Sequence, residues 1–140
     1  MVMIELKWSP AFEIGIELID AAHRKLFAMV NEIRQAIGGN EPDLCRTRVE
    51  AFIAAAEKHF AEEEEFLDQV GYAETRQHKA YHTILLNKAE RLKEACDKKM
   101  DGDNAEECYG EVMTFLIDDV VRGDHQFKSY LDHKGLTTRK

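Results

Sequence analysis

The chain of 140 residues contains little that would interrupt a helix and little that is typical of a β-sheet. It has only two prolines, Pro10 and Pro42. Proline lacks a backbone N–H and interrupts helices, so most of the chain is free of such a helix breaker. No stretch alternates apolar and polar residues in the way of a half-buried strand. We therefore expect an all-α protein, and 140 residues suit a single domain over residues 1–140 with one core.

Other absences restrict the partners and the compartment. The net charge of −8 argues against nucleic acid or an anionic membrane as a partner, because both attract basic surfaces. There is no run of about 18 apolar residues and no layout of a signal peptide. The three cysteines, Cys45, Cys96 and Cys108, show no CxxC spacing, and their odd number predicts free thiols in a reducing compartment. We therefore expect a cytoplasmic protein in which Cys96 is a small apolar core residue.

The apolar residues that are present recur at the spacing of helices. This periodicity predicts four helices, over residues 16–37, 42–70, 74–98 and 105–122. Gly38 and Gly39 suit the end of the first helix, and Pro42 suits the start of the second. Four long helices with short connections predict an antiparallel up-down-up-down four-helix bundle. The N-terminal segment is expected to be irregular, with Trp8 as an aromatic lid on the core.

A polar pair interrupts the apolar stripe of the second predicted helix. His59 and Glu63 are four residues apart and share a helix face with Phe52 and Ala56. A carboxylate buried on such a face is costly unless another charge compensates it, and a metal ion would do so. Taken alone, the run of four glutamates that includes Glu63 is also typical of a solvated helix face.

Polar residues on the other apolar stripes map to the same end of the bundle. In an antiparallel arrangement, the first and third helices start where the second and fourth finish. The candidates at this level are His23, His59, Glu63, His78, His82, Asp119 and Asp124. Any one of these residues, such as His23, could be an ordinary hydrogen-bonded core residue. Unrelated buried polar residues, however, would not be expected to lie at the same level along the bundle axis.

A set of four histidines and three carboxylates exceeds what one metal ion takes. It suits two ions bridged by carboxylates inside a bundle core. By ligand type alone, imidazole and carboxylate together suit iron, manganese or zinc. His125 and His133 lie outside the stripes and are expected to be solvated.

The sequence resembles the bacteriohemerythrins over roughly residues 8–127. The matching pieces are Trp8, Gly15 with the segment 19–23, the segment 59–63, Gly71 with Tyr72, and the segment 78–82. The resemblance implies two iron ions, bridged by oxide or hydroxide, with dioxygen as a ligand. It assigns His23 and His59 to the iron that binds dioxygen, His78 and His82 to the other iron, and Glu63 and Asp124 to the bridge.

The sequence departs from the family pattern in the fourth helix. Asp119 stands five residues before Asp124, where the family normally has a histidine. If Asp119 binds as a terminal ligand of the second iron, its charge favours the ferric state and predicts fast autoxidation. If it points away, that iron has an open position. Leu116 matches a leucine that lines the family's oxygen pocket, and Phe115 stands where a tryptophan is common.

Several functions are compatible with these residues. The first is a non-haem di-iron protein that binds dioxygen for transport, storage or delivery and has no catalytic residues. The second is a module that senses oxygen or redox state for a signalling partner, and the third is a di-iron oxidase or peroxidase. A helical bundle without metal is the fourth. We expect dioxygen, and an oxygen-accepting or signalling protein, as partners of a monomer.

Overall fold

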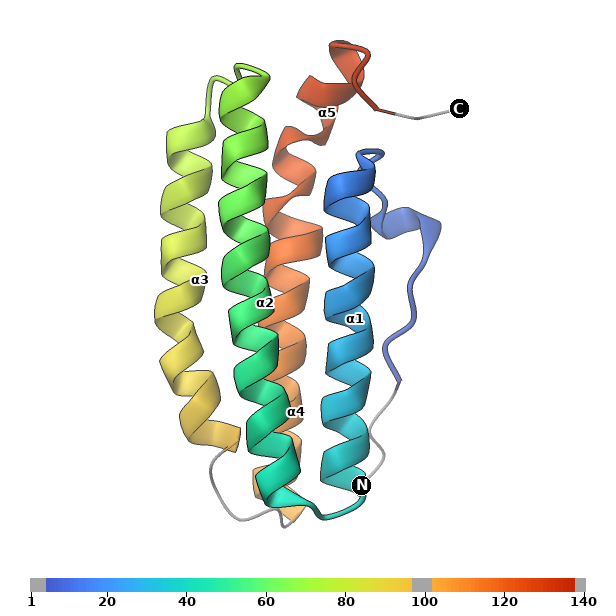
Figure 1. The fold of residues 1–140 in the computed structure, drawn as a ribbon, viewed down its shortest axis with the longest axis vertical. Helices are drawn as coiled ribbons and strands as arrows, with labels where there is room; N and C mark the ends of the chain where they lie inside the picture. Colours follow the sequence, from blue (N-terminus) through green and yellow to red (C-terminus); the bar gives the residue numbers. More distant parts are fainter. Residues whose placement is uncertain (1–4, 97–101, 138–140) are drawn as a thin grey trace.

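The computed structural model describes residues 5–96 and 102–137, and the regular structure within these ranges is helical. The four long helices are α1 (Glu17–Gly38), α2 (Pro42–Gln69), α3 (Thr75–Cys96) and α4 (Gly102–Ile117). Three short elements accompany them: η1 (Pro10–Phe12), the π-helical η2 (Asp118–Gly123) and α5 (His125–His133). The predicted antiparallel four-helix bundle is confirmed (Figure 1).

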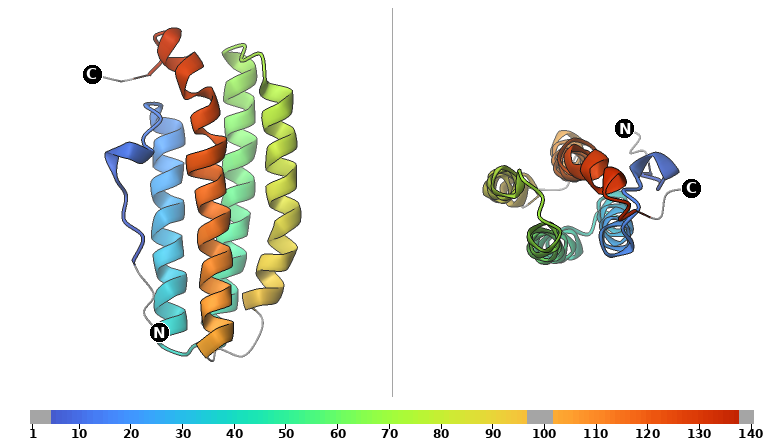
Figure 2. Two further views of the ribbon diagram at one scale, coloured as in Figure 1. Left: turned by 180° about the vertical axis from the view of Figure 1, so that it is seen from behind. Right: turned by 90° about the horizontal axis from the view of Figure 1, so that it is seen from above.

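Each long helix packs against the next one along the chain, and α4 also packs against α1. Seen from above, the four helices stand around a common axis (Figure 2). The starts of α1 and α3 lie at the same end of the bundle as the end of α2 (Figure 1). None of the helices within residues 5–96 and 102–137 combines the length and the apolar composition needed to cross a bilayer.

The helix ends follow local sequence signals. Pro42 occupies the first turn of α2, where its missing N–H has no helical partner in any case. After α2 the chain reverses at Gly71, whose φ of 72° lies in the left-handed region that favours glycine. The predicted end of the third helix at Lys98 lies outside the described residues.

The fourth predicted helix differs most from the observed structure. Instead of running unbroken to Arg122, the α-helical geometry ends at Ile117 and becomes π-helical. The Asp124 N–H donates to the Asp119 carbonyl at 2.9 Å, which is the i→i+5 bond of a π-turn. On an α-helix, two residues five apart would be separated by about 140° around the axis. The wider turn brings Asp119 and Asp124 to the same side.

The apolar core consists of two clusters. The larger fills the bundle from the α1–α2 turn to the level of Leu26, Phe60 and Leu116. The smaller cluster closes the other end with Ile14, Ile19, Leu67, Phe127 and Leu131. Trp8 is half-buried against the larger cluster and packs edge-on against Phe27, with ring centroids 5.1 Å apart, as expected for a lid. The candidate polar residues lie in the helices between these two clusters.

The prediction of three free thiols is wrong. Cys96 at the end of α3 and Cys108 in α4 form a disulfide, with their Cα atoms 4.7 Å apart. Cys45 is free and buried, and burial raises the pKa of its thiol. Disulfides are rare in cytosolic proteins, so the cysteines no longer support a reducing compartment.

Thiol counting tests this disulfide. After denaturation without reductant, we expect one reactive thiol per chain, and three after reduction, because the chain has three cysteines. Reduction is expected to lower the free energy of unfolding by about 2–3 kcal/mol, the usual effect of opening a short loop. In the control variant Cys45→Ala, the two counts should fall to zero and two. Three thiols before reduction would contradict the assignment.

Candidate metal centre

The seven predicted ligand residues lie together between the two apolar clusters. Four histidines and three carboxylates come from α1, α2, α3, η2 and the residue that follows η2: His23, His59, Glu63, His78, His82, Asp119 and Asp124. None of these residues is more than 5% exposed. The structure thus brings together all seven residues that the sequence placed at one end of the bundle.

Two groups of four residues each place one ligand atom per residue within 4.8 Å of the others. The first group is His23, His59, Glu63 and Asp124, and the second is Glu63, His78, His82 and Asp124. Glu63 and Asp124 belong to both groups. Asp119 belongs to neither, although its carboxylate oxygens lie 3.6–3.7 Å from the ring nitrogens of three histidines.

The first group joins α1 to α2. The Nε2 atoms of His23 and His59 are 3.0 Å apart, so both rings aim their ligand nitrogen at the same point. His23 Nε2 lies 2.6 Å from Asp124 Oδ2, and His59 Nε2 lies 3.2 Å from Glu63 Oε2. These four side chains can surround one ion.

The second group joins α2 to α3. His78 Nε2 lies 2.8 Å from Glu63 Oε1 and 3.2 Å from Asp124 Oδ1. His82 Nε2 lies 3.2 Å from the same Glu63 oxygen. Because His78 and His82 are four residues apart on α3, one helix face presents both rings.

Glu64 supports His82 from outside the centre, and sequence analysis missed this role. Its Oε2 lies 2.9 Å from His82 Nδ1. An ionised carboxylate can only accept, so the Nδ1–H donates and the Nε2 lone pair is left for a metal. The ring of Phe60 stacks on the His82 ring at 4.0 Å and fixes its plane. The available signal was the position next to Glu63, which we assigned to a solvated run.

The charges in this group depend on one another in the metal-free chain. Burial alone would lower the pKa of His78, but Asp124 and Glu63 outweigh burial and raise the pKa to about 10. Burial would raise the pKa of Asp124, but the close ring nitrogens of His23, His59 and His78 hold that pKa well below its usual range. Burial and the Asp124 charge raise the pKa of Asp119. Protonated histidines therefore supply the positive charge that the buried carboxylates need.

Several of the possible ligand atoms lack a hydrogen-bond partner within the protein, and a metal ion could bind them. Glu63 Oε2, His82 Nε2 and both carboxylate oxygens of Asp119 and of Asp124 are buried without a well-formed hydrogen bond. Buried polar atoms left in this state are costly. Cations placed among them would satisfy these atoms, and four imidazoles with three carboxylates are a suitable donor set for divalent transition metals.

A surface hollow reaches one side of the centre. It lies between α1 and α2, has a volume of about 280 Å³ and includes His59 in its wall. Its other lining residues are mostly apolar: Leu18, Ala21, Ala22, Leu26 and Ala55, with Lys25, Lys58 and Glu62. A small molecule in this hollow would meet the first group before the second.

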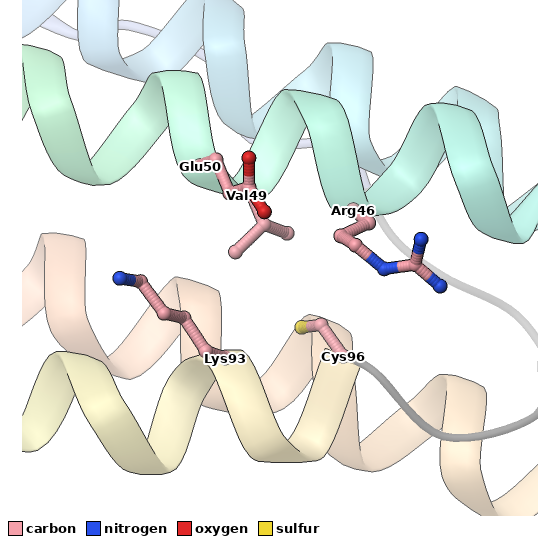
Figure 3. Close-up of a pocket in the computed structure, with 5 residues that line it drawn as sticks. All are labelled: Arg46, Val49, Glu50, Lys93 and Cys96. Carbon is pink, nitrogen blue, oxygen red and sulfur yellow. The ribbon is translucent and has the colours of Figure 1, made fainter.

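A second hollow, of about 120 Å³, lies between α2 and α3 beside the disulfide (Figure 3). It is lined by Arg46, Val49, Glu50, Lys93 and Cys96. None of these residues is a predicted ligand, so we assign this hollow no part in the metal centre.

The two predicted pocket residues and the two remaining histidines lie in different surroundings. Leu116 and Phe115 are buried, and Phe115 stacks on Phe60, with ring centroids 6.2 Å apart. His133 is exposed as expected. The same expectation is wrong for His125, which is half-buried with Nδ1 3.0 Å from the Val120 carbonyl and Nε2 3.3 Å from the Ala11 carbonyl. His125 therefore links α5 to the N-terminal segment and lies outside both ligand groups.

Comparison with known proteins agrees with this geometry. Residues 14–126 match the Hemerythrin HHE cation binding domain. The chain is 28% identical to a bacteriohemerythrin of Clostridium acetobutylicum over 127 residues, covering 86% of this chain and 96% of that protein. It is 26% identical to a bacteriohemerythrin of Stenotrophomonas maltophilia, covering 89% and 79%. With a bacteriohemerythrin of Pseudomonas aeruginosa, the identity is 29%, covering 61% and 56%. The chain therefore belongs to the hemerythrin family of cation-binding domains.

Proposed function

We propose that this domain binds two iron ions and uses them to bind dioxygen for transport, storage or delivery. The observation that carries the proposal is that two ligand groups share Glu63 and Asp124. Two groups that share carboxylates suit a pair of bridged ions better than one ion. Ferrous iron would supply the electrons that hold dioxygen, and the membership in the hemerythrin family favours iron over manganese or zinc.

Each side chain has a defined task in this proposal. His23 and His59 would hold one ion, and His78 and His82 would hold the other. Glu63 and Asp124 would lie between the ions, together with an oxide or hydroxide bridge. Asp119 would add a further carboxylate oxygen to the centre, since its oxygens face the histidines at 3.6–3.7 Å.

The surroundings favour dioxygen binding at the ion held by His23 and His59. Only this pair has a member, His59, in the wall of the 280 Å³ hollow between α1 and α2. Leu116 and Phe115 are buried and apolar, and we propose that they exclude water from the dioxygen site. Exclusion of water protects a ligand that protons would otherwise release.

Iron loading followed by oxygen exposure tests the proposed function. The chain is loaded with ferrous iron without oxygen, its iron content is measured, and its absorption spectrum is recorded as oxygen is added and removed. We expect two irons per chain and a visible band that comes and goes with oxygen over several cycles. A spectrum that does not respond to oxygen would contradict dioxygen binding.

Narrowing the hollow should slow the entry of dioxygen. Ala55 lines the hollow without belonging to either ligand group, so Ala55→Phe fills space and leaves the donor atoms in place. We expect iron content to be unchanged and the stopped-flow rate of the oxygen-induced absorption change to fall by about tenfold, or ~1.4 kcal/mol of barrier. The control is Ala80→Phe, at an exposed position of α3. Equal rates in both variants would show that dioxygen takes another route.

A redox-sensing role is the second candidate, and Asp119 is the observation that favours it. Three buried carboxylates face the four histidines, and each added negative charge stabilises ferric iron. A sensor would oxidise once and remain oxidised, with a change in shape or in affinity for a partner. Repeated oxygen cycles without loss of the visible band would favour the carrier instead.

A further inference from the structure

The two shared carboxylates divide their oxygens between the histidine pairs in the same way. Glu63 directs Oε2 to His59 at 3.2 Å and Oε1 to His78 at 2.8 Å. Asp124 directs Oδ2 to His23 at 2.6 Å and Oδ1 to His78 at 3.2 Å. One oxygen of each carboxylate thus belongs to the His23–His59 pair, and the other belongs to the His78–His82 pair.

Asp119 repeats this division. Its Oδ2 lies 3.7 Å from His23 Nε2 and 3.6 Å from His59 Nε2. Its Oδ1 lies 3.7 Å from His82 Nε2. Both oxygens are buried and have no well-formed hydrogen bond. A terminal ligand of the second ion would direct its oxygens to His78 and His82 alone, and a side chain pointing away would reach neither pair.

We propose that Asp119 is a third bridging carboxylate, which binds one ion through each oxygen. This inference rests on the proposed di-iron function. Two ligands of one ion, each bonded at about 2.1 Å, lie roughly 3.0–4.2 Å apart depending on the angle between them. The distances of 3.6–3.7 Å from the Asp119 oxygens to the histidine nitrogens fall inside this range.

The backbone explains how an aspartate reaches this position. The π-turn of η2 places Asp119 and Asp124 on the same side, with the Asp124 N–H bonded to the Asp119 carbonyl at 2.9 Å. An aspartate is shorter than a histidine, so its carboxylate stops between the two pairs instead of extending into one of them. The side chain is 1% exposed, which leaves water little access as a competing partner.

A third bridge would make the two ions equivalent. Each ion would receive two imidazole nitrogens and three carboxylate oxygens, one from each of Glu63, Asp119 and Asp124. The pattern that the resemblance implies, with a third histidine on one ion, is unequal by contrast. Equivalence of the two ions is therefore the property that separates a bridging Asp119 from a terminal one.

Mössbauer spectroscopy of the fully iron-loaded chain without oxygen measures this equivalence. The wild-type chain should give one quadrupole doublet that carries all of the iron absorption. Asp119→Asn should give two doublets of equal area, because the amide offers one good ligand oxygen instead of two. Asp119→His should also give two doublets, because its imidazole would bind a single ion.

Asp118→Asn is the matched control. It makes the same chemical change one residue away, where the carboxylate Oδ1 faces Arg122 Nη1 at 3.2 Å instead of the histidines. This variant should keep the single doublet of the wild-type chain. Circular dichroism of each variant checks that it is folded.

Two results would overturn the inference in different ways. Two irons per chain that give two distinct doublets in the wild type as well as in Asp119→Asn would refute the bridge and leave the di-iron function intact. Fewer than two irons per chain in the wild type would remove the di-iron function on which the bridge depends.

Discussion

Glu63→Gln is expected to reduce the iron content of the chain from two ions to nearly none. Of the three carboxylates in the centre, Glu63 alone lies within 3.2 Å of three histidines, His59, His78 and His82. It also belongs to both ligand groups, so its replacement should weaken the binding of both ions at once. Changes beyond the direct ligands typically cost 10–100-fold in metal affinity, so removal of a shared ligand should cost more than about 100-fold.

The matched control for Glu63→Gln is Glu65→Gln on the same helix. Glu65 is exposed and belongs to neither ligand group, yet the chemical change is identical. Iron is measured per chain after equilibrium dialysis against a fixed concentration of free ferrous ion. The control should retain two irons. Loss of one ion instead of both from Glu63→Gln would show that Glu63 serves only one of them.

Removal of the metal is expected to lower the melting temperature more than any surface change. A ligand at 1,000 times its Kd stabilises the folded state by about 4 kcal/mol. For a domain of this size, 4 kcal/mol corresponds to roughly 15 °C in Tm, and two ions would double the effect. The physical reason is that the metal-free chain keeps three carboxylates buried, several of whose oxygens have no well-formed hydrogen bond.

Thermal unfolding of the iron-loaded chain, with and without a chelator, measures this stabilisation. The Glu63→Gln variant provides the control, because a chain that holds no iron should melt at the same temperature in both conditions. If the chelator does not change the Tm of the wild-type chain, the centre contributes nothing to folding and the buried carboxylates are satisfied in another way.

The fold and the level of the centre could be predicted because they depend on periodicity. Apolar residues three and four apart define each helix face, and antiparallel packing then sets the height of every polar residue on those faces. His23, His59, Glu63, His78 and His82 each lie on such a stripe, so their convergence follows from the sequence. The five-residue spacing of Asp119 and Asp124 does not fit an α-helix, and this misfit was the available signal for the π-turn.

The features that sequence analysis missed depend on contacts between helices. The Cys96–Cys108 bond requires the end of α3 to lie beside α4, and an odd number of cysteines gave no reason to pair these two. Glu64 on α2 contacts His82 on the neighbouring helix α3, although the neighbours of Glu64 in the sequence suggested a solvated face. His125 likewise bonds to the carbonyl of Ala11, a residue far away in the chain. Spacing along one helix does not encode such contacts.

A crystal structure of the iron-loaded chain tests most directly whether two metal ions share Glu63 and Asp124. An anomalous difference map at the iron absorption edge is expected to show two peaks, about 3.5–4 Å apart as in other two-metal sites. One peak should lie beside His23 and His59, and the other beside His78 and His82. A single peak, or two peaks without a shared carboxylate, would contradict the account.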